Sequence, residues 1–296
     1  MEAGVRPLPK MDYAAPSSLK EVFKLLKQYQ HEARLLAGGT DVIPKMKKRL
    51  FSADLLIDLN RIPGLSGIKL QEDGLHIGGL TRLAEIKESL LVKEKAPALV
   101  QAIRIMASPP IRNRATLAGN LCTASPAADT APPLLVLDAS VKLQSEQGER
   151  VVFLSEFFLG PQKTARRPDE IATEVIVPAQ EGRSAFLKLG RRKAFTLSVV
   201  SAAAFTRVRG GKFEEVRLAL GAVAPTPIRI RKVEEALRGK EVNEENIARV
   251  AELIKEEVRP ISDVRASEEY RREMSWVFTR RVLAQLNGGG YHEGAI

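Results

Sequence analysis

Residues 111–132 read IRNRATLAGNLCTASPAADTAP, and they gather polar turns, the only cysteine and an isolated carboxylate into one stretch. Thr116 and Asn120 can supply side-chain donors, and Gly119 between them lets a ligand approach the backbone closely. Asp129 is the only ionisable group in a run of small apolar residues. Its carboxylate either caps the start of a helix or hydrogen-bonds a polar ligand edge. The stretch therefore predicts one side of a binding site with room for a flat molecule.

A second glycine cluster lies at residues 35–41, LLAGGTD. A strand that ends in Gly38 and Gly39 can turn successive backbone amides toward one point and so bind an anion. Thr40 adds a hydroxyl donor, and a helix starting near Asp41 would direct its positive end to the same point. An ordinary tight turn explains the same motif. The sequence matches neither a Rossmann fingerprint nor a P-loop, so two separate corners of neutral donors predict a different cradle for a pyrophosphate.

The composition is that of a globular protein with room for two domains. Of the 296 residues, 44% are hydrophobic, and no apolar run reaches the roughly 18 residues of a membrane span. The single cysteine, Cys122, cannot hold an iron–sulfur cluster alone, because such clusters need about four thiolates. We therefore expect any cluster to belong to another chain. We also expect a cytoplasmic protein without membrane insertion.

Histidine spacing and charge argue against metal and nucleic-acid binding. His31, His76 and His292 lie far apart in the sequence, so we expect no zinc site and predict surface or loop positions for all three. Lys and Arg number 46 against 36 Asp and Glu, a net charge of +10. The two signs are mixed along the C-terminal segments, and aromatic residues make up 5% of the chain, so we expect no nucleic-acid binding. A basic subunit that docks on acidic partners fits the same charge.

Apolar periodicity predicts an α+β fold with short mixed strands. A helix is expected over residues 17–29, with Ser18 and Glu21 as a capping box. Further helices are expected over residues 93–107 and after a cap at Thr81.

Residues 178–183, PAQEGR, lack apolar periodicity and predict a domain boundary. Beyond it, strands are expected on both sides of residues 209–212, RGGK, because glycines adopt the positive φ angles of a hairpin turn. Three amphipathic helices are predicted to end the chain, near residues 229–238, 243–257 and 267–286.

Three motifs occur in order along the chain: LLAGGTD at 35–41, IRNRATLAGNLCTASPAADTAP at 111–132 and FLKLGRRKAFTLSVVSAAA at 186–204. Together they resemble the FAD-binding medium subunits of the molybdenum hydroxylases, the group of carbon monoxide dehydrogenase and xanthine dehydrogenase. The resemblance covers nearly the whole chain. It implies a PCMH-type FAD-binding domain over residues 1–179, built from two α/β subdomains near 1–58 and 59–179. It further implies a C-terminal domain over residues 180–290 with a three-stranded antiparallel sheet and helices.

The resemblance also implies the residues that surround a noncovalently bound FAD. The backbone of residues 35–42 would wrap the diphosphate, and Asp129 would reach the sugar or ring portion. Lys188 would lie beside the isoalloxazine, where a cation favours the reduced flavin. A solvated basic turn explains Lys188, Arg191 and Arg192 as well. No catalytic or metal-binding residue is implied, and the cofactor-binding set is Leu35, Leu36, Ala37, Gly38, Gly39, Thr40, Asp41, Val42, Thr116, Gly119, Asn120, Thr123, Asp129, Ala172 and Lys188.

Three positions near this implied site need separate interpretation. Met106 and Ala172 stand where the family contacts flavin through larger side chains. Cys122 could bond flavin covalently, as a cysteine or histidine does in some flavoproteins of the wider fold class. We interpret it as a small buried apolar residue instead.

The implied function is that of an electron-transfer subunit, an oxidoreductase component without its own substrate site. A [2Fe-2S] subunit would deliver electrons to FAD, which would pass them to an external acceptor, while molybdopterin would reside in a large partner subunit. A dimer of heterotrimers is the implied assembly. Two alternatives remain open from the residues alone: a flavin-free scaffold subunit, and a stand-alone flavin oxidoreductase.

Overall fold

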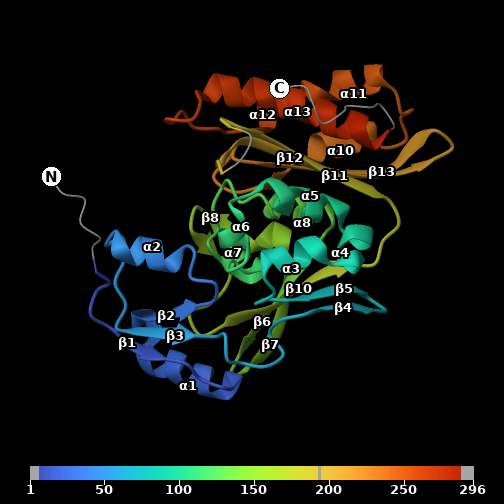
Figure 1. Ribbon diagram of the computed structural model, residues 1–296. Coiled ribbons are helices and arrows are strands. Elements are labelled where there is room, and N and C mark those ends of the chain that lie inside the picture. Colours follow the sequence, from blue (N-terminus) through green and yellow to red (C-terminus); the bar gives the residue numbers. More distant parts are fainter. Residues whose placement is uncertain (1–6, 193–194, 288–296) are drawn as a thin grey trace.

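The computed structural model describes residues 7–192 and 195–287. Its first lobe, residues 12–58, is a parallel sheet in the order β1-β3-β2, with α1 packed against it (Figure 1). The apolar face of α1 buries Val22 and Leu26 in this lobe's core. The elements of the lobe are β1 (Asp12–Ala14), α1 (Leu19–Tyr29), the 3-10 helix η1 (Gln30–Glu32), β2 (Ala33–Leu36), α2 (Val42–Lys47) and β3 (Leu55–Asp58).

The second lobe, residues 68–178, is an antiparallel sheet in the order β4-β5-β10-β6-β7 with helices on one face. Its strands are β4 (Ile68–Gln71), β5 (Gly74–Gly78), β6 (Ser140–Ser145), β7 (Gly148–Phe153) and β10 (Ile171–Pro178), and β8 (Phe158–Gly160) pairs separately with β9 (Lys163–Thr164). Its helices are α3 (Leu83–Glu88), α4 (Leu90–Lys95), α5 (Pro97–Ile105), α6 (Pro109–Arg112), α7 (Leu117–Cys122), α8 (Ala131–Val136) and α9 (Leu154–Phe157).

The C-terminal unit, residues 183–286, is a four-stranded antiparallel sheet in the order β11-β12-β13-β14 covered by helices. The expected sheet had three strands. The fourth, β14, is a two-residue segment that pairs with β13, too short to give an alternating apolar pattern. The elements are β11 (Arg183–Gly190), β12 (Ser198–Arg209), β13 (Lys212–Gly221), β14 (Ile228–Arg229), α10 (Arg231–Leu237), α11 (Glu244–Ala251), α12 (Ile254–Glu257) and α13 (Glu268–Leu286).

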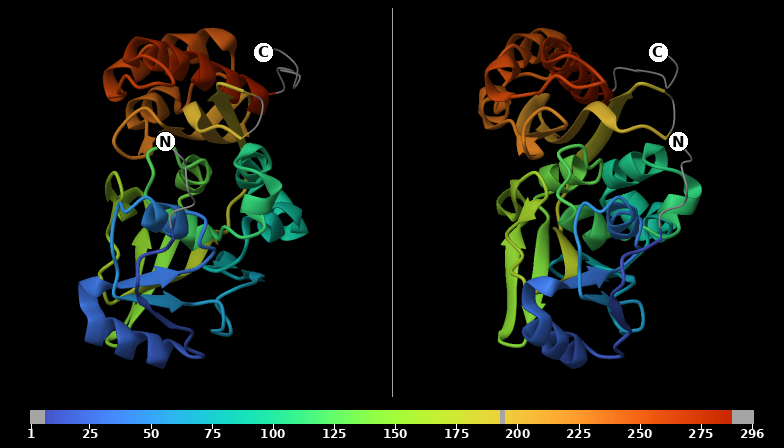
Figure 2. Two further views of the ribbon diagram at one scale, coloured as in Figure 1. Left: turned by 60° about the vertical axis from the view of Figure 1, so that its left-hand side comes forward. Right: turned by 90° about the vertical axis from the view of Figure 1, so that its left-hand side faces the viewer.

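The C-terminal sheet lies between two layers of helices, with α10 to α13 on one side and α5 and α8 on the other (Figure 2). Side-chain alternation along β12 explains how one sheet serves both layers. Ala203 and Phe205 pack into the core of the second lobe, whereas Ala202 and Ala204 pack into the core of the C-terminal helices. The apolar core of the second lobe is therefore continuous with the C-terminal unit.

Several predicted local structures are confirmed. Ser18 caps α1 by accepting a hydrogen bond from the amide of Glu21, although the Glu21 carboxylate returns to the amide of Ser17 and not to Ser18. The turn between β12 and β13 has positive φ at Gly210 and Gly211, as a hairpin turn requires.

Other local predictions are wrong, for identifiable reasons. The helix predicted over residues 93–107 is divided into α4 and α5, because Pro97 begins a new helix and cannot continue the old one. The helix predicted over residues 243–257 is likewise divided into α11 and α12. Thr81 does not cap α3; its hydroxyl bonds the backbone of Gly67 in a neighbouring loop.

His76 also departs from its predicted surface position. It lies within β5 with 6% of its surface exposed, between Asp73 and Glu174. His31 is exposed on η1, as expected, and His292 lies outside the described residues.

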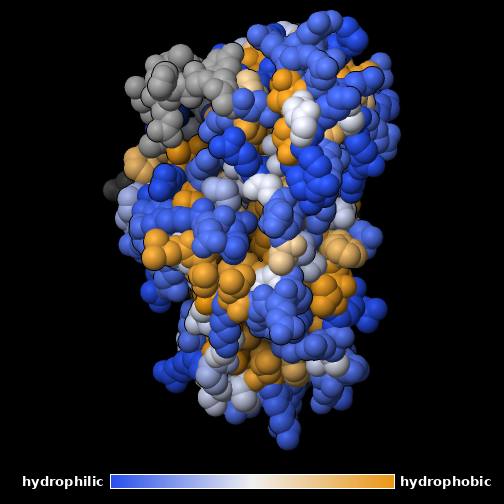
Figure 3. Space-filling view, turned by 90° about the vertical axis from the view of Figure 1, so that its right-hand side faces the viewer, coloured by the Kyte–Doolittle hydropathy of each residue, from blue (hydrophilic) through white to orange (hydrophobic). Residues whose placement is uncertain are grey.

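The molecular surface is mostly hydrophilic, with apolar residues gathered across the middle of one face (Figure 3). The elements β4 and α4 lie toward this side in Figure 1. Leu70 on β4 is 49% exposed, and Leu90 on α4 is 80% exposed. Across the described ranges 7–192 and 195–287, no helix combines the length and the apolar character needed to cross a bilayer.

Candidate functional site

The first glycine cluster forms the corner that follows β2. Gly39 has a φ of +76°, a left-handed conformation that favours glycine. A Cβ on Gly38 would overlap the carbonyl oxygen of Arg114, so the corner can press against that segment only because residue 38 has no side chain. Within the described chain, the amides of residues 38–42 donate to no protein acceptor. This run of free donors has the property of an anion-binding nest.

The second corner is built differently from the first. The Thr116 hydroxyl accepts the amide of Gly119 and caps α7, and the amides of residues 117–120 all have protein acceptors. Its free donors are therefore on side chains. Asn120 accepts a hydrogen bond from the Thr130 hydroxyl through Oδ1, which fixes the amide plane and leaves Nδ2 available to a ligand. A Cβ on Gly119 would lie 2.7 Å from Thr116 Oγ1, so glycine keeps the cap intact.

The two corners line one cavity of about 1020 Å³. Much of its wall comes from the first lobe, at residues 34, 35 and 37–42, and from the second lobe, within residues 115–129. Residues 195–197 from the C-terminal unit also line it. Leu36 and Lys188 do not belong to this lining. The other predicted cofactor-binding residues line it: Leu35, Ala37, Gly38, Gly39, Thr40, Asp41, Val42, Thr116, Gly119, Asn120, Thr123, Asp129 and Ala172.

Asp129 joins the cavity wall to the C-terminal unit. Its carboxylate accepts Lys188 Nζ at 2.6 Å and the Ser198 hydroxyl, and it does not cap α8. The Lys188 ammonium also donates to the carbonyl of Thr196 at 2.8 Å, and its side chain is 4% exposed. Burial raises the pKa of Asp129, while Lys188 and Ser198 oppose the rise. Lys188 thus stands behind Asp129 and adds positive charge to this wall without facing the cavity.

Several lining residues carried no sequence signal. Lys45 pairs with Asp41 at 2.8 Å and donates to Gln162 at 3.1 Å, which connects α2 to the turn between β8 and β9. Gln162, Ala107 and Phe195 have positive φ angles although they are not glycines. Such backbone strain often accompanies functional sites. Only the tertiary fold brings these residues together, because they come from four separate segments.

Cys122 and Met106 also line the cavity, and Cys122 is half-buried there, not fully buried as we expected from the sequence. Burial raises the pKa of the Cys122 thiol, and the nearby Arg166 only partly opposes this. A thiol with a raised pKa is a weak nucleophile, which agrees with its interpretation as unreactive. In the described part of the chain, no cluster of three His, Cys, Asp or Glu side chains could hold a metal ion.

Comparison with known proteins identifies the family. Residues 9–180 match the family described as "FAD binding domain in molybdopterin dehydrogenase", and residues 185–286 match the "CO dehydrogenase flavoprotein C-terminal domain". The chain belongs to this flavoprotein family. The resemblance drawn from the three sequence motifs is therefore confirmed.

Relatives in this flavoprotein family match along almost their whole length. The glyceraldehyde dehydrogenase medium chain of Sulfolobus acidocaldarius is 33% identical over 94% of this chain and 99% of its own. The xanthine dehydrogenase FAD-binding subunit of Escherichia coli O157:H7 is 34% identical over 92% of this chain and 94% of its own. These relatives are subunits of dehydrogenases.

Solved structures confirm the α+β architecture. A chain of carbon monoxide dehydrogenase from Hydrogenophaga pseudoflava superposes with a TM-score of 0.93 at 32% identity, covering 96% of this chain and 99% of that one. Quinoline 2-oxidoreductase from Pseudomonas putida 86 gives a TM-score of 0.91 at 30% identity, covering 96% of this chain and 100% of that one. The PCMH-type unit with its C-terminal unit is thus the fold of this chain.

The residues of the cavity fit FAD by their own chemistry. Five consecutive free amides beside two glycines suit a diphosphate, which is bound by aimed dipoles as readily as by cations. Small side chains in the lining, such as Ala127, Ala128 and Ala172, leave space for a flat ring.

Proposed function

We propose that this chain binds FAD noncovalently in the cavity and serves as the electron-transfer subunit of a molybdenum hydroxylase complex. The observation that carries the proposal is that residues 38–42, whose amides donate to no acceptor in the described chain, line the same cavity as Asn120 and Asp129. The amides would hold the diphosphate from one side, and Asn120 Nδ2 would donate to it from the other.

The residues near Asp129 would surround the sugar or ring portion. When bound, FAD supplies both one-electron and two-electron transfer, chemistry that the protein tunes through charge and position. Lys188 sits behind the Asp129 carboxylate and offsets its negative charge. We propose that this pair sets the local charge felt by the flavin, with Lys188 acting through Asp129 and not by direct contact.

The partners follow from the same proposal. The chain has one cysteine, so a [2Fe-2S] subunit would deliver electrons, and a large subunit would carry molybdopterin. Relatives called medium chains and FAD-binding subunits support a position between these two. We propose a dimer of heterotrimers in the cytoplasm, with the chain divided into residues 1–179, themselves subdivided near residue 58, and residues 180–290.

Reconstitution of the full chain tests this function. We expect the purified protein to take up about one FAD per chain and to show a protein-bound flavin spectrum. Without partner subunits, it should lack turnover with NADH or a small alcohol. A chain that takes up no FAD would support the flavin-free scaffold. Turnover by the isolated chain would support the stand-alone oxidoreductase.

A further inference from the structure

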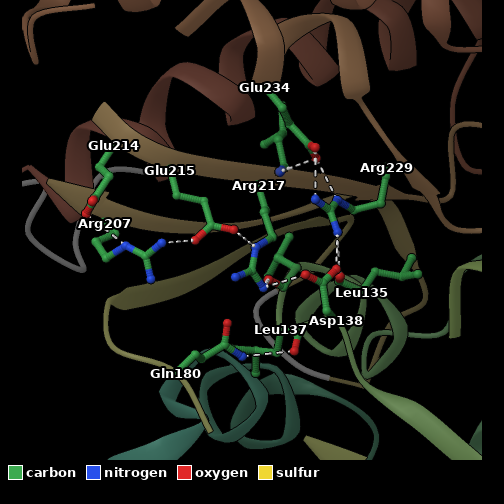
Figure 4. A network of polar contacts seen from close by, with 12 residues as sticks. Leu135, Leu137, Asp138, Gln180, Arg207, Glu214, Glu215, Arg217, Arg229 and Glu234 are labelled. Atoms are coloured by element: carbon green, nitrogen blue, oxygen red, sulfur yellow. Dashed lines mark hydrogen bonds and ion pairs between the residues drawn. The ribbon is translucent and has the colours of Figure 1, made fainter. Parts of the chain in front are cut away.

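The helix α8 is fastened to the C-terminal sheet at both of its ends. Asp129 lies two residues before the helix and holds Lys188 of β11 and Ser198 of β12. Asp138 lies two residues after the helix and pairs with Arg217 of β13 and Arg229 of β14 (Figure 4). The first contact is at the cavity wall, and the second is remote from it.

The remote contact is made mainly by two buried arginines. Arg217 donates to the carbonyl of Val136 at 2.9 Å and lies 2.9 Å from Asp138 Oδ2. Arg229 donates to the carbonyl of Leu135 at 3.0 Å and to Asp138 Oδ1 at 2.7 Å. Cations at the last carbonyls of a helix complement its dipole. Both oxygens of Asp138 and two terminal carbonyls of α8 are therefore held by one sheet.

The arginines are themselves fixed by further partners. Glu234 accepts both Arg229 Nε at 2.6 Å and Nη2 at 2.8 Å, and it also accepts the amide of Leu218 (Figure 4). Glu215 accepts Arg217 Nε at 2.8 Å, and the Arg217 guanidinium lies 4.3 Å from the centre of the Phe205 ring. The side chains of Arg217 and Arg229 are 9% and 5% exposed. These partners leave each guanidinium one orientation.

The backbone at Asp138 adds to this constraint. Its φ is +49°, in the left-handed region where Asp and Asn are better tolerated than most residues. This conformation ends α8 and presents the carboxylate to both arginines. Asparagine at residue 138 would keep the backbone conformation and remove the charge.

We propose that Asp138, Arg217 and Arg229 are positioning residues of the flavin cavity. They fix the position of the C-terminal sheet along α8, and in that position Lys188 and Ser198 contact Asp129. A six-residue helix is about 9 Å long and stiff, so a shift of the sheet at one end is carried to the other. Lys188 is buried with two acceptors, Asp129 and Thr196. Thr196 belongs to the C-terminal unit and moves with Lys188, but Asp129 does not, so a shift of the sheet relative to α8 separates the buried ammonium from its carboxylate. The inference rests on the proposed function, because it concerns the charge beside bound FAD.

The test uses the full chain reconstituted with FAD. Asp138→Asn is compared with Glu245→Gln, which makes the same carboxylate-to-amide change in an exposed ion pair with Arg249. We expect Asp138→Asn to weaken FAD binding by about tenfold, a size of effect known for residues that act on a site without touching it. We also expect it to lower the flavin midpoint potential, because the cation behind Asp129 is displaced. Glu245→Gln should leave both quantities unchanged.

A double-mutant cycle with Lys188→Gln isolates the route of the effect. Lys188→Gln should itself lower the midpoint potential, and adding Asp138→Asn should then lower it no further. Arg229→Lys keeps the positive charge but loses one of the two hydrogen bonds to Glu234. It should therefore lower the midpoint potential by a smaller amount. This variant replaces Asp138→Asn in the test if Asp138→Asn does not fold.

Three results would overturn the proposal: Asp138→Asn behaving like Glu245→Gln, a loss of thermal stability with an unchanged flavin potential, or an equal shift of potential in the Lys188→Gln background. Failure of the unmodified chain to bind FAD would instead refute the proposed function.

Discussion

At the scale of single residues, the glycine pair explains how two distant segments meet. Gly38 has no side chain to separate its corner from Arg114, and Gly39 supplies the left-handed backbone conformation of the turn. The two glycines therefore have different tasks. One permits contact between the lobes, and the other shapes the anion site.

Gly39→Val should abolish flavin retention. Valine strongly disfavours a φ of +76°, so the corner would rearrange and redirect its free amides. Gly210→Val is the matched control, because Gly210 has a φ of +57° in a hairpin turn with open space around it. Each change should cost at least roughly 1 kcal/mol of stability, but only Gly39→Val should release FAD. Equal flavin content in the two purified proteins would contradict the site assignment.

At the scale of elements, polar side-chain contacts shape the start of α7 and join neighbouring strands of the five-stranded sheet. At the start of α7, the Thr116 hydroxyl accepts the amide of Gly119, and the other amides of the first turn bond backbone carbonyls. The second corner therefore depends on the side chain of Asn120. β5 and β10 are joined across the sheet by His76 and Glu174, with Asp73 from the preceding turn. Because His76 titrates, its contacts with Asp73 and Glu174 make the stability of this sheet depend on pH.

His76 should make the five-stranded sheet lose stability as pH rises. Burial lowers the pKa of His76, but its contacts with Asp73 and Glu174 raise it more, so the pKa lies above its ordinary value of 6.5. The folded state then binds the proton more tightly than the unfolded state. The resulting stability is fully present below pH 6.5 and is lost as pH climbs through the raised pKa of the folded protein. Its size is about 1.4 kcal/mol for each pH unit that separates the folded-state pKa from the unfolded-state pKa.

Denaturant unfolding at a series of pH values measures this effect. The unmodified protein should decline in stability above pH 6.5, and His76→Gln should flatten that decline. His31→Gln, at an exposed histidine, should leave the decline in place. If His76→Gln kept the same pH dependence, the linkage would lie elsewhere.

At the scale of the whole molecule, the cavity is assembled from all three parts of the chain. Thr40 comes from the first lobe, Asn120 from the second and Leu197 from the C-terminal unit. A ligand that contacts all three should stabilise them together. The continuous core between the second lobe and the C-terminal sheet supports the same coupling.

FAD should therefore raise the unfolding transition of the C-terminal unit as well as that of the lobes. Trp276, the only tryptophan, lies on α13 and reports on that unit by fluorescence, while far-ultraviolet circular dichroism reports on the whole chain. At 100 times its Kd, FAD should add about 2.7 kcal/mol to the free energy of unfolding. Riboflavin, which lacks the diphosphate, should add much less. A tryptophan transition unmoved by FAD would show that the C-terminal unit unfolds independently of the site.

Local chemistry in the sequence was enough to locate both corners of the site. Glycines act through backbone geometry over a few residues, so LLAGGTD and the stretch at 111–132 could be interpreted before the fold was known. The roles of Thr116 as a cap and of Asp129 as the partner of Lys188 and Ser198 were not predicted. The same local logic located the hairpin at Gly210 and the start of α1.

Only the tertiary structure decided which charged groups contact one another. His76 became a buried strand residue because its carboxylate partners come from the preceding turn and from β10, and Lys188 moved behind Asp129 because β11 and β12 approach α8 together. Burial and pairing depend on neighbours that lie up to about a hundred positions apart in the chain, as Glu174 does from His76. Sequence periodicity indicates which face of a segment is buried, but it does not indicate which distant charged residue will contact that face.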